Sequence, residues 1–374
     1  MLTKYTLLMV LMTLVVFAYG NGAKKQRQAL KWGIAAAGKI CSDFVNALST
    51  LSSADHQVIA VAARTNLTRA QEFAQKFSIS TAYAGYENLA LNSVIDIVYI
   101  GNLNPQHYST AKLMLDHGKS VLMEKPLTMN GKQSKELTML AQRKGVFFAE
   151  GLWSRYLPIY KFIRQEIRAG KLGEIVRVDA ELGSVRPQPR FQIKELGGGA
   201  ILDFGSYGID ILQWIFEDDP LDIEATGKLN DNGVDTDVTA VFSYCNDRKA
   251  TLKLSINEDL KNVLKIVGTK RSMEIPSFWY GTSLIDANGK QHNWPLPTGA
   301  KYPFNNTNRA GLAYEAEAVR KYIRAGKKQS DLATHAVSLS IARIQDELRR
   351  QVGVVYINDF DVNYISPNLN IFNK

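Results

Sequence analysis

The sequence has few of the residues on which cross-linked or metal-bound folds depend. Only two of its 374 residues are cysteines, Cys41 and Cys245, and they form no Cys-x-x-Cys pair. A disulfide framework and a cysteine-based metal site are therefore excluded, and we expect both residues to be free, buried thiols. The chain also lacks internal repeats, heptads and low-complexity segments, which excludes solenoid, coiled-coil and disordered architectures.

Neither sign of charge forms a long run. The 45 Lys and Arg residues exceed the 36 Asp and Glu residues and give a net charge of +9, but they are scattered among the acidic residues. Nucleic-acid-binding surfaces usually need clustered cations, so we expect no nucleic-acid partner. The surplus of positive charge instead mildly favours the binding of an anionic cofactor.

The apolar run at the N-terminus is too short to cross a bilayer comfortably. It extends over 13 residues from Leu7 to Tyr19, whereas a membrane helix needs about 20. Lys4 precedes the run and Gly20 follows it, a pattern typical of a signal peptide. We expect residues 1–20 to be cleaved, which leaves no stable membrane span and sends the protein to the secretory pathway, either the endoplasmic-reticulum lumen or the exterior. A permanent anchor, or a cytoplasmic location if the signal is inefficient, is the alternative.

The first part of the remaining chain reads as an α/β domain. Short apolar runs alternate with helical patterns over residues 30–150, which is typical of βαβ units and predicts a doubly wound, parallel Rossmann sheet. The predicted strands lie at 32–37, 56–63, 95–101, 120–125 and 146–150.

The second part has the pattern of an α+β domain, expected over residues 151–354. Six alternating segments between residues 174 and 275 predict one large, mostly antiparallel, open-faced sheet. Helical spacing predicts helices at 158–169, 311–327 and 335–353. The tail, residues 355–374, has no strong period and receives no assignment.

The loop after the first predicted strand resembles a dinucleotide site with missing glycines. Where the fingerprint has three glycines, the chain has Ala36, Gly38 and Cys41. We expect pyrophosphate binding to survive, because a strand, a tight turn and a helix N-terminus provide most of it, and small residues with negative φ cost little there. Arg64 follows the second strand where an NAD-specific site has a carboxylate, which favours NADP. The alternatives are that the loop is only a structural turn between strand and helix, and that Arg64 is only a solvated surface cation.

Two further motifs carry candidate catalytic groups. "EKP" places Lys125 at the carboxyl end of a predicted strand, where ligands bind in open α/β sheets. "GGGAILDFGSYGID" places Asp203 and Tyr207 four residues apart, and we expect them on one face of one helix. Without further information, a surface lysine and a core tyrosine are the plainer interpretations of these positions.

In combination these stretches resemble the Gfo/Idh/MocA oxidoreductase family. Within it they are most similar to a group of dimeric, NADP-dependent dehydrogenases that act on trans-dihydrodiols or on aldoses such as D-xylose. The resemblance extends from about Leu30 to Val354, and the matching blocks include "LKWGIAAAGKICSDF", "GKSVLMEKPLTMN", "EGLWSRYLP" and "GGGAILDFGSYGID".

The resemblance implies a role for each candidate residue, no metal, and a homodimer formed through the open face of the second sheet. Hydride would pass between NADP and a carbinol carbon of a small-molecule substrate, and Lys125 would lower the pKa of the Tyr207 phenol by favouring the phenolate. The implied roles are Tyr207 as general acid/base with Lys125 beside it; Asp203, Trp153 and Arg155 in the substrate pocket; Gly38, Lys39 and Ile40 at the pyrophosphate; Arg64 at the 2′-phosphate; and His107 and Glu124 near the nicotinamide.

Two departures leave alternatives open. The N-terminal signal, and a loop after Arg64 that carries the sequon Asn66-Leu67-Thr68, do not fit a cytosolic NADP enzyme, and a second sequon begins at Asn305. A reductase of sugar-derived carbonyls or dicarbonyls is one alternative. A secreted, non-catalytic nucleotide- or sugar-binding protein is the other.

Overall fold

The computed structural model describes residues 29–360 of the chain. The expected signal peptide at residues 1–20 and all of the tail beyond residue 360 lie outside the described residues. Within residues 29–360, no helix is long and apolar enough to cross a membrane.

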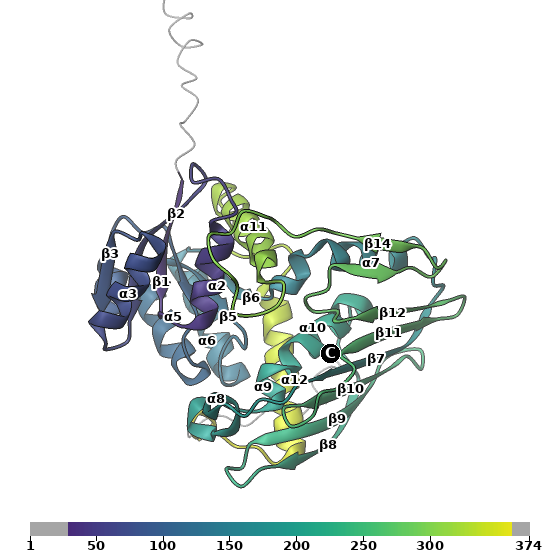
Figure 1. The fold of residues 1–374 in the computed structure, drawn as a ribbon. Helices are drawn as coiled ribbons and strands as arrows, with labels where there is room; N and C mark the ends of the chain where they lie inside the picture. The colour runs from purple at the N-terminus through teal and green to yellow at the C-terminus, as the bar shows by residue number, and fades with distance from the viewer. Residues whose placement is uncertain (1–28, 361–374) are drawn as a thin grey trace, which may run out of the picture.

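The N-terminal domain is built on a six-stranded parallel sheet in the order β3-β2-β1-β4-β5-β6, which confirms the Rossmann prediction (Figure 1). Because the chain order reverses beside β1, a crevice opens at the carboxyl ends of the strands there. Strand β3 is not predicted, since its residues TAYA are only partly buried or exposed and do not form an apolar run like those of the equally short β4 and β6. The strands are β1 (Leu30–Ala35), β2 (His56–Ala63), β3 (Thr81–Ala84), β4 (Ile97–Ile100), β5 (Ser120–Glu124) and β6 (Phe148–Gly151).

Five helices connect these strands and cover the sheet. Each buries an apolar stripe, as in α2, where Phe44 stacks on Tyr99 of β4 at 3.7 Å between ring centroids. Asn side chains cap two of them: the Oδ1 atoms of Asn66 and Asn130 accept the backbone N–H groups of Arg69 and Gln133. The helices are α2 (Lys39–Leu48), α3 (Leu67–Phe77), α4 (Glu87–Leu91), α5 (His107–Asp116) and α6 (Gly131–Lys144).

The second domain contains a six-stranded sheet in the order β12-β11-β7-β10-β9-β8. All six predicted segments are strands of this sheet, and the prediction of a mostly antiparallel sheet is confirmed, with β7 and β10 as the pair that runs parallel. Two short strands, β13 (Ser283–Ile285) and β14 (Gln291–Asn293), form a separate hairpin. The strands are β7 (Ile175–Gly183), β8 (Asp222–Leu229), β9 (Asp235–Ser243), β10 (Lys249–Ser255), β11 (Val263–Gly268) and β12 (Ser272–Pro276).

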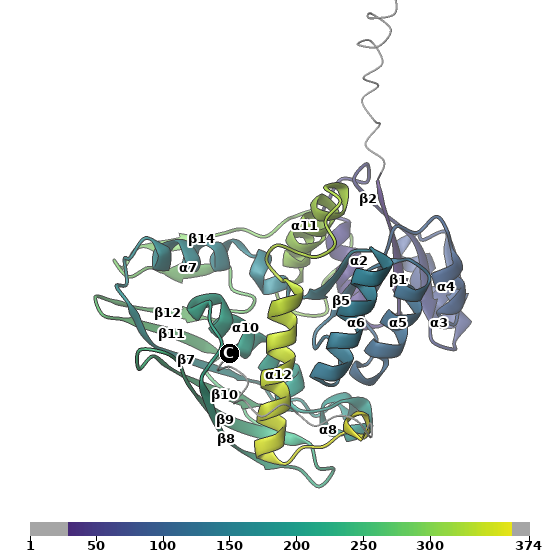
Figure 2. The same cartoon turned by 180° about the vertical axis from the view of Figure 1, so that it is seen from behind.

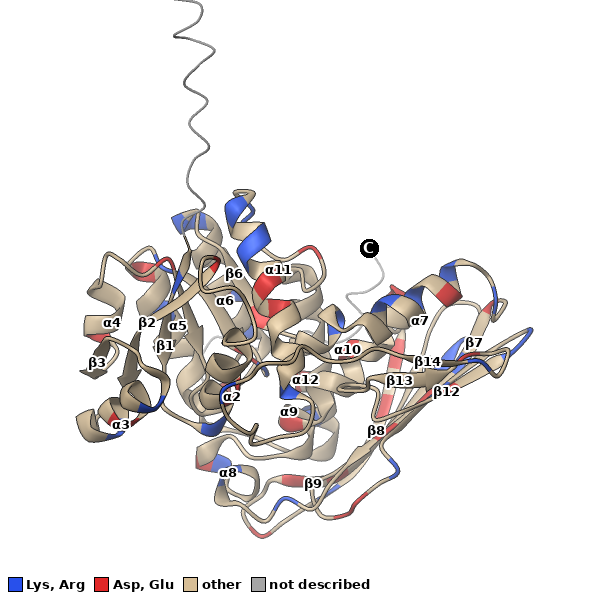
Figure 3. Ribbon diagram, turned by 45° about the horizontal axis from the view of Figure 1, so that its top comes forward, with Lys and Arg blue, Asp and Glu red and all other residues tan. Residues whose placement is uncertain are grey.

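The two faces of this sheet differ in burial. Along β9, Val238, Ala240 and Phe242 are buried, whereas Thr239 and Val241 between them are exposed. Helices α9 (Ala200–Asp203), α10 (Gly205–Phe216) and α12 (His335–Val352) cover the apolar face. The outward face carries charges of both signs, which are also dispersed over the rest of the ribbon (Figure 3).

The chain returns to the N-terminal domain after completing the second sheet. Helix α11 (Leu312–Arg324) packs on α2, and α12 passes between α6 of the first domain and β8 of the second (Figure 2). The His56 ring and the Glu317 carboxylate, 3.0 Å apart, join β2 to α11. The predicted division near residue 150 separates the two sheets, while α11 and α12 pack against both domains. Helix α7 (Pro158–Arg168) and the short α8 (Pro189–Gln192) complete the second domain.

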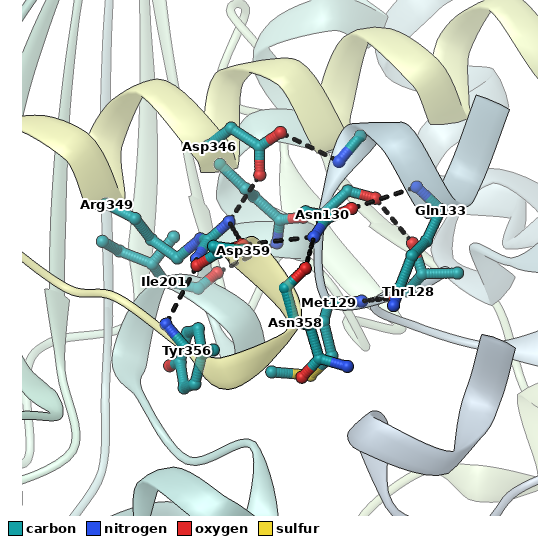
Figure 4. A network of polar contacts seen from close by, with 12 residues as sticks. Thr128, Met129, Asn130, Gln133, Ile201, Asp346, Arg349, Tyr356, Asn358 and Asp359 are labelled. Atoms are coloured by element: carbon teal, nitrogen blue, oxygen red, sulfur yellow. Dashed lines mark hydrogen bonds and ion pairs between the residues drawn. The ribbon is translucent and has the colours of Figure 1, made fainter. Parts of the chain in front are cut away.

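A polar network fixes the last described residues (Figure 4). Arg349 of α12 donates to Asp346 and to Asp359, in each case with an N–O distance of 2.6 Å. Asn130, at the start of α6, donates to the Asn358 carbonyl and to Asp359. Residues 355–360, to which the sequence assigned no structure, are thus bonded to both domains.

The two cysteines are free, but only one is buried. Cys41 lies in α2 with its Sγ against the carbonyls of Ala35 and Gly101, and burial raises the pKa of its thiol to about 12. Cys245 follows β9 and is exposed, so the expectation that both are buried is wrong for this residue.

Candidate active site

A cleft of about 600 Å³ lies between the carboxyl ends of β1, β2, β4 and β5 and the α9–α10 region of the second domain. This volume is within the range of small-molecule and cofactor sites. Nine of the sequence-predicted site residues line it: Gly38, Lys39, Ile40, Arg64, His107, Glu124, Lys125, Asp203 and Tyr207.

The turn after β1 differs from expectation in one backbone angle. Ala36, at the first vacated glycine position, has φ +113°, a region that L-residues rarely adopt. The prediction that a negative φ makes alanine inexpensive here is therefore wrong, and the alanine is strained. Gly38 has an ordinary φ of −95°, and a Cβ atom built on it would meet only the Gly101 carbonyl oxygen, at 3.9 Å. What glycine provides at Gly38 is therefore open space in the cleft.

The start of α2 fits an anionic ligand. Its N-cap residue, Gly38, has no side chain to bond the free N–H groups, and its first turn contains no acidic residue. The first N–H groups of a helix have no partner within the helix and carry partial positive charge. Lys39 and Ile40 begin this helix at the edge of the cleft, so the turn is built to hold a pyrophosphate.

Three cations surround this end of the cleft. Lys39, Arg64 and Arg69 all line it, and the Arg69 Nε donates to the Ala37 carbonyl at 3.2 Å. The two carboxylates of the lining, on Glu124 and Asp203, lie at the catalytic end. The sequence missed Arg69; the available signal was that the first turn of the helix after β2 faces the same edge of the sheet as Arg64.

The two sequons differ in their surroundings. Asn66 is exposed at the rim of the cleft beside Arg64. The Nδ2 of Asn305 instead donates to the carboxylate of the buried Asp43 at 2.8 Å. Both residues are exposed, but the amide nitrogen of Asn305 is engaged in hydrogen bonds to the protein.

His107 and Glu124 form the buried wall near the centre of the cleft. The His107 ring lies between the Pro126 carbonyl, 2.8 Å from Nδ1, and the Asn102 carbonyl, 3.3 Å from Nε2. Burial lowers the pKa of His107, which keeps the ring neutral. Glu124 accepts a hydrogen bond from the Tyr99 hydroxyl at 2.6 Å. Both groups are already oriented by the protein.

Lys125 links the two domains at the catalytic end. Its Nζ donates to the Asp203 carboxylate at 2.7 Å and to the Asp203 carbonyl at 2.9 Å, and it lies 4.5 Å from the centroid of the Tyr207 ring. Burial alone would lower the pKa of Lys125, but the charge of Asp203, its hydrogen bond and the nearby Tyr207 and Glu124 together more than offset this and raise the pKa. Lys125 is therefore a fixed cation beside the phenol.

Asp203 and Tyr207 do not share one helix. Asp203 ends α9, and Tyr207 lies in α10 after a break at Phe204, so the single-helix prediction is wrong. Gly199, with φ +132°, allows the chain to enter α9 in a conformation that other residues avoid. The two side chains still converge, because both contact Lys125.

The Tyr207 hydroxyl has two further neighbours. The indole Nε1 of Trp153 donates to it at 3.2 Å. The guanidinium of Arg309 is also within hydrogen-bonding reach, and it lies 4.8 Å from the centroid of the Trp153 ring. Trp153 is buried behind the tyrosine and does not line the cleft, whereas Arg309 does.

Arg155 does not line the cleft. Its guanidinium is buried, pairs with the Asp210 carboxylate and donates to the Leu332 carbonyl at 2.7 Å. The expectation that it contacts substrate is contradicted by this placement. The side chain joins α10 to the segment before α12.

The sequence missed several lining residues of the catalytic end. Trp279 lies 6.2 Å from Tyr207 and 6.3 Å from Phe204 between ring centroids. Some of these residues lie in the short helix α8 or at the break between α9 and α10, and the others in irregular segments, so no periodic pattern marked them. The residues missed at this end are Arg186, Gln188, Arg190, Phe191, Phe204, Trp279 and Arg309.

The chain matches two family models. Residues 30–152 match the oxidoreductase family with an NAD-binding Rossmann fold, GFO_IDH_MocA. Residues 160–274 match the GFO/IDH/MocA C-terminal domain. The matched segments agree with the two sheets of the structure.

Curated relatives match over most of the chain. Trans-1,2-dihydrobenzene-1,2-diol dehydrogenase of Xenopus tropicalis is 42% identical over 331 residues, which are 88% of this chain and 99% of the relative. The enzymes of the same name from Danio rerio and Mus musculus are 42% and 38% identical, with the same two coverages.

Solved structures share the fold. A 3-ketoreductase from Actinomadura kijaniata, solved with NADP and TDP-benzene, aligns with a TM-score of 0.75 at 21% identity, over 88% of this chain and all of that one. An aldose-aldose oxidoreductase from Caulobacter crescentus aligns with the same TM-score at 17% identity, over 87% and 98% of the two chains. The chain therefore belongs to the Gfo/Idh/MocA family of oxidoreductases and is a dehydrogenase with an NAD-binding Rossmann domain.

Proposed function

We propose that this protein is an NADP-dependent dehydrogenase that acts on the CH–OH group of a trans-dihydrodiol or of an aldose such as D-xylose. The observation that carries the proposal is the position of Lys125 between Asp203 and the Tyr207 ring, at the end of the cleft opposite its cationic rim. The names of the curated relatives support the substrate class.

The preference for NADP rests on charge at the other end. Lys39, Arg64 and Arg69 can neutralise a 2′-phosphate, and no carboxylate follows β2 to repel it. When bound, NADP⁺ supplies the chemistry of accepting a hydride from the carbinol carbon.

The residues of the chain supply positioning and proton transfer. The Tyr207 oxygen takes the hydroxyl proton of the substrate, and in the reductive direction returns it. Lys125 and Arg309 stabilise negative charge on that oxygen, and Trp153 orients it through Nε1. Asp203 holds Lys125 in place. The rings of Phe204 and Trp279 exclude water from the reacting groups.

The test is the initial rate of NADPH formation by protein that begins at Asn21. Trans-1,2-dihydrobenzene-1,2-diol and D-xylose are the substrates, and Tyr207→Phe is the control. We expect turnover that the variant loses by a factor of about 10² or more. NADPH binding without turnover of either substrate would contradict the proposal and favour a binding protein.

We further propose a homodimer through the outward face of the second sheet. That face is left uncovered by the described residues, and the exposed Thr239 and Val241 of β9 lie on it. Light scattering after size-exclusion chromatography should give twice the mass of the chain. A monomer at micromolar concentration would refute this.

We also propose entry into the secretory pathway. The support is the N-terminal pattern described above, which lies outside the described residues. N-terminal sequencing of protein purified from a eukaryotic host should begin at Asn21. An intact Met1 in soluble protein would place the enzyme in the cytoplasm instead.

A further inference from the structure

Three arginines of the catalytic half of the cleft have no carboxylate partner. Arg186, Arg190 and Arg309 line the cleft, and within residues 29–360 none of them forms an ion pair. Elsewhere in the protein, buried guanidinium groups are paired: Arg155 with Asp210, and Arg349 with Asp346 and Asp359. Arg190 is exposed, whereas Arg186 and Arg309 are partly buried and have buried guanidinium nitrogens without an acceptor. Because unpaired buried donors are costly, Arg186 and Arg309 indicate a role in binding.

Arg186 is held in position without being satisfied. Its guanidinium carbon lies 5.4 Å from the centroid of the Phe204 ring and 5.5 Å from that of Phe191. Its Nε is buried and donates to no acceptor. The guanidinium carbon of Arg190 also lies against the Phe191 ring, 3.9 Å from its centroid. Aromatic stacking orients such a planar group and leaves its N–H donors free for a ligand.

Arg309 has unsatisfied donors of its own. Its Nε and Nη1 are buried and have no hydrogen-bond partner among the described residues. Its neighbours include the Tyr207 hydroxyl and the Trp153 ring, and the charge of Glu124 acts on it without forming an ion pair among the described residues. The three N–H bonds of these two nitrogens therefore have no acceptor within residues 29–360.

The carboxylates of this half of the cleft are already engaged. Asp203 accepts from Lys125 at 2.7 Å, and Glu124 accepts from the Tyr99 hydroxyl at 2.6 Å. The phosphates of a bound dinucleotide have their own donors at the start of α2 and on Arg64 and Arg69, at the other end. Positive charge thus remains in excess where the substrate binds.

We propose that the substrate of this site carries an anionic group, a carboxylate or a phosphate, that Arg186 and Arg309 bind and Arg190 attracts. The inference rests on the proposed function, from which it takes the hydride-transfer reaction. It narrows the substrate class to acidic sugars and hydroxy acids. The C1–H bond breaks and its electron pair passes to NADP⁺ as hydride, while the hydroxyl proton passes to the Tyr207 oxygen. An acidic sugar in its ring form thereby gives a lactone and NADPH, whereas a hydroxy acid loses the hydride from its carbinol carbon and gives a keto acid and NADPH.

The test uses three sugars that differ only at C6: D-glucose, D-glucuronate and D-glucose 6-phosphate. We measure kcat/KM for each with NADP⁺ at saturation. At least one anion should exceed glucose about tenfold or more, since charge-assisted hydrogen bonds to a planar guanidinium have at least that effect. The better anion identifies the group. Equal values, or a preference for glucose, would overturn the inference.

Variants separate the arginines from the rest of the cleft. In Arg186→Met or Arg309→Met, the ratio of kcat/KM for the better anion to that for glucose should fall about tenfold. Arg164→Met is the matched control, because Arg164 stacks on Trp214 at 3.3 Å outside the cleft. Its ratio should be that of the wild type. An unchanged ratio in both test variants would overturn the inference.

Direct binding distinguishes failure of this inference from failure of the proposed function. D-Glucuronate and D-glucose 6-phosphate are titrated calorimetrically into the NADPH-bound protein. Binding that weakens in Arg186→Met, in a protein that turns over no sugar, would leave the anion site intact and reject the dehydrogenase. Turnover of D-xylose without detectable binding of either anion would reject the anion site alone.

Discussion

The strained alanine in the cofactor turn leads to a prediction with a defined sign. Ala36 has φ +113°, where a Cβ atom costs roughly 1–3 kcal/mol. Ala36→Gly removes that cost. Glycine also raises the conformational entropy of the unfolded chain, which lowers the free energy of unfolding by about 0.5–1 kcal/mol. The hydrogen bond from the Ala36 N–H to the Ala62 carbonyl, 2.9 Å long, is retained. We therefore expect a net stabilisation of about 1 kcal/mol.

Ala37 provides the matched control. It also lines the cleft and is partly buried against the same core, but its φ is not positive. Ala37→Gly should lose about 0.5–1 kcal/mol, because only the entropy change remains. The two substitutions are chemically identical and one residue apart, so the opposite signs isolate backbone strain.

Thermal unfolding followed by circular dichroism measures both variants. A gain of about 1 kcal/mol corresponds to roughly 2–4 °C in Tm for domains of this size. NADPH affinity should be kept in Ala36→Gly, since only one methyl group is removed and the backbone of the turn is retained. The reasoning fails if Ala36→Gly melts at or below the wild-type temperature, in line with Ala37→Gly.

Three further predictions concern the cofactor site, the catalytic cation and a buried acid. The Gly38→Trp variant should fold normally, because the new side chain enters the open cleft. It should weaken NADPH binding, measured by fluorescence titration, about a hundredfold or more. Unchanged affinity would reject the cofactor site. Lys125→Met should lower kcat by a factor of about 10² or more, whereas Lys125→Arg should recover part of it; equal rates in the two variants would exclude a role for the charge. Burial raises the pKa of Glu150 to about 7. Between about pH 4.5 and 7 the folded state therefore keeps a proton on Glu150 that the unfolded state has lost. The free energy of unfolding falls by up to about 3 kcal/mol as pH rises through this range. Denaturant titrations across that range should show a smaller decrease for Glu150→Gln, which keeps an acceptor for the Leu127 N–H; identical slopes would show that Glu150 does not titrate there.

Local patterns predicted elements well where one physical signal was sufficient. Buried apolar runs gave β2 at its observed bounds, His56–Ala63, and helical spacing gave α12 within one residue of His335–Val352. Burial of one face imposes a period of two on strands and of 3.6 on helices, and that period is visible in the residues themselves. The prediction of a Rossmann sheet followed from the alternation of such segments.

Predictions that depended on conformation or on distant partners were less reliable. The residue type of Ala36 did not reveal its positive φ, because that angle is imposed by the turn between β1 and α2. Arg155 was expected in the substrate pocket, but Asp210 in α10 draws its guanidinium into the core. The parallel pairing of β7 with β10 also depends on which strands meet, and strand patterns do not encode partners.

The sequence by itself determined the two-sheet α/β architecture, the family and the motifs that contain Gly38, Lys125 and Tyr207, because each depends on local pattern or on short runs of residue types. Only the tertiary structure decided which charges meet. It placed Arg309, from a segment before α11, against Tyr207, and within residues 29–360 it gave that arginine no ion-pair partner. Hydrogen bonds and desolvation act over a few ångströms in space, and residues about a hundred positions apart acquire such neighbours only when the chain folds.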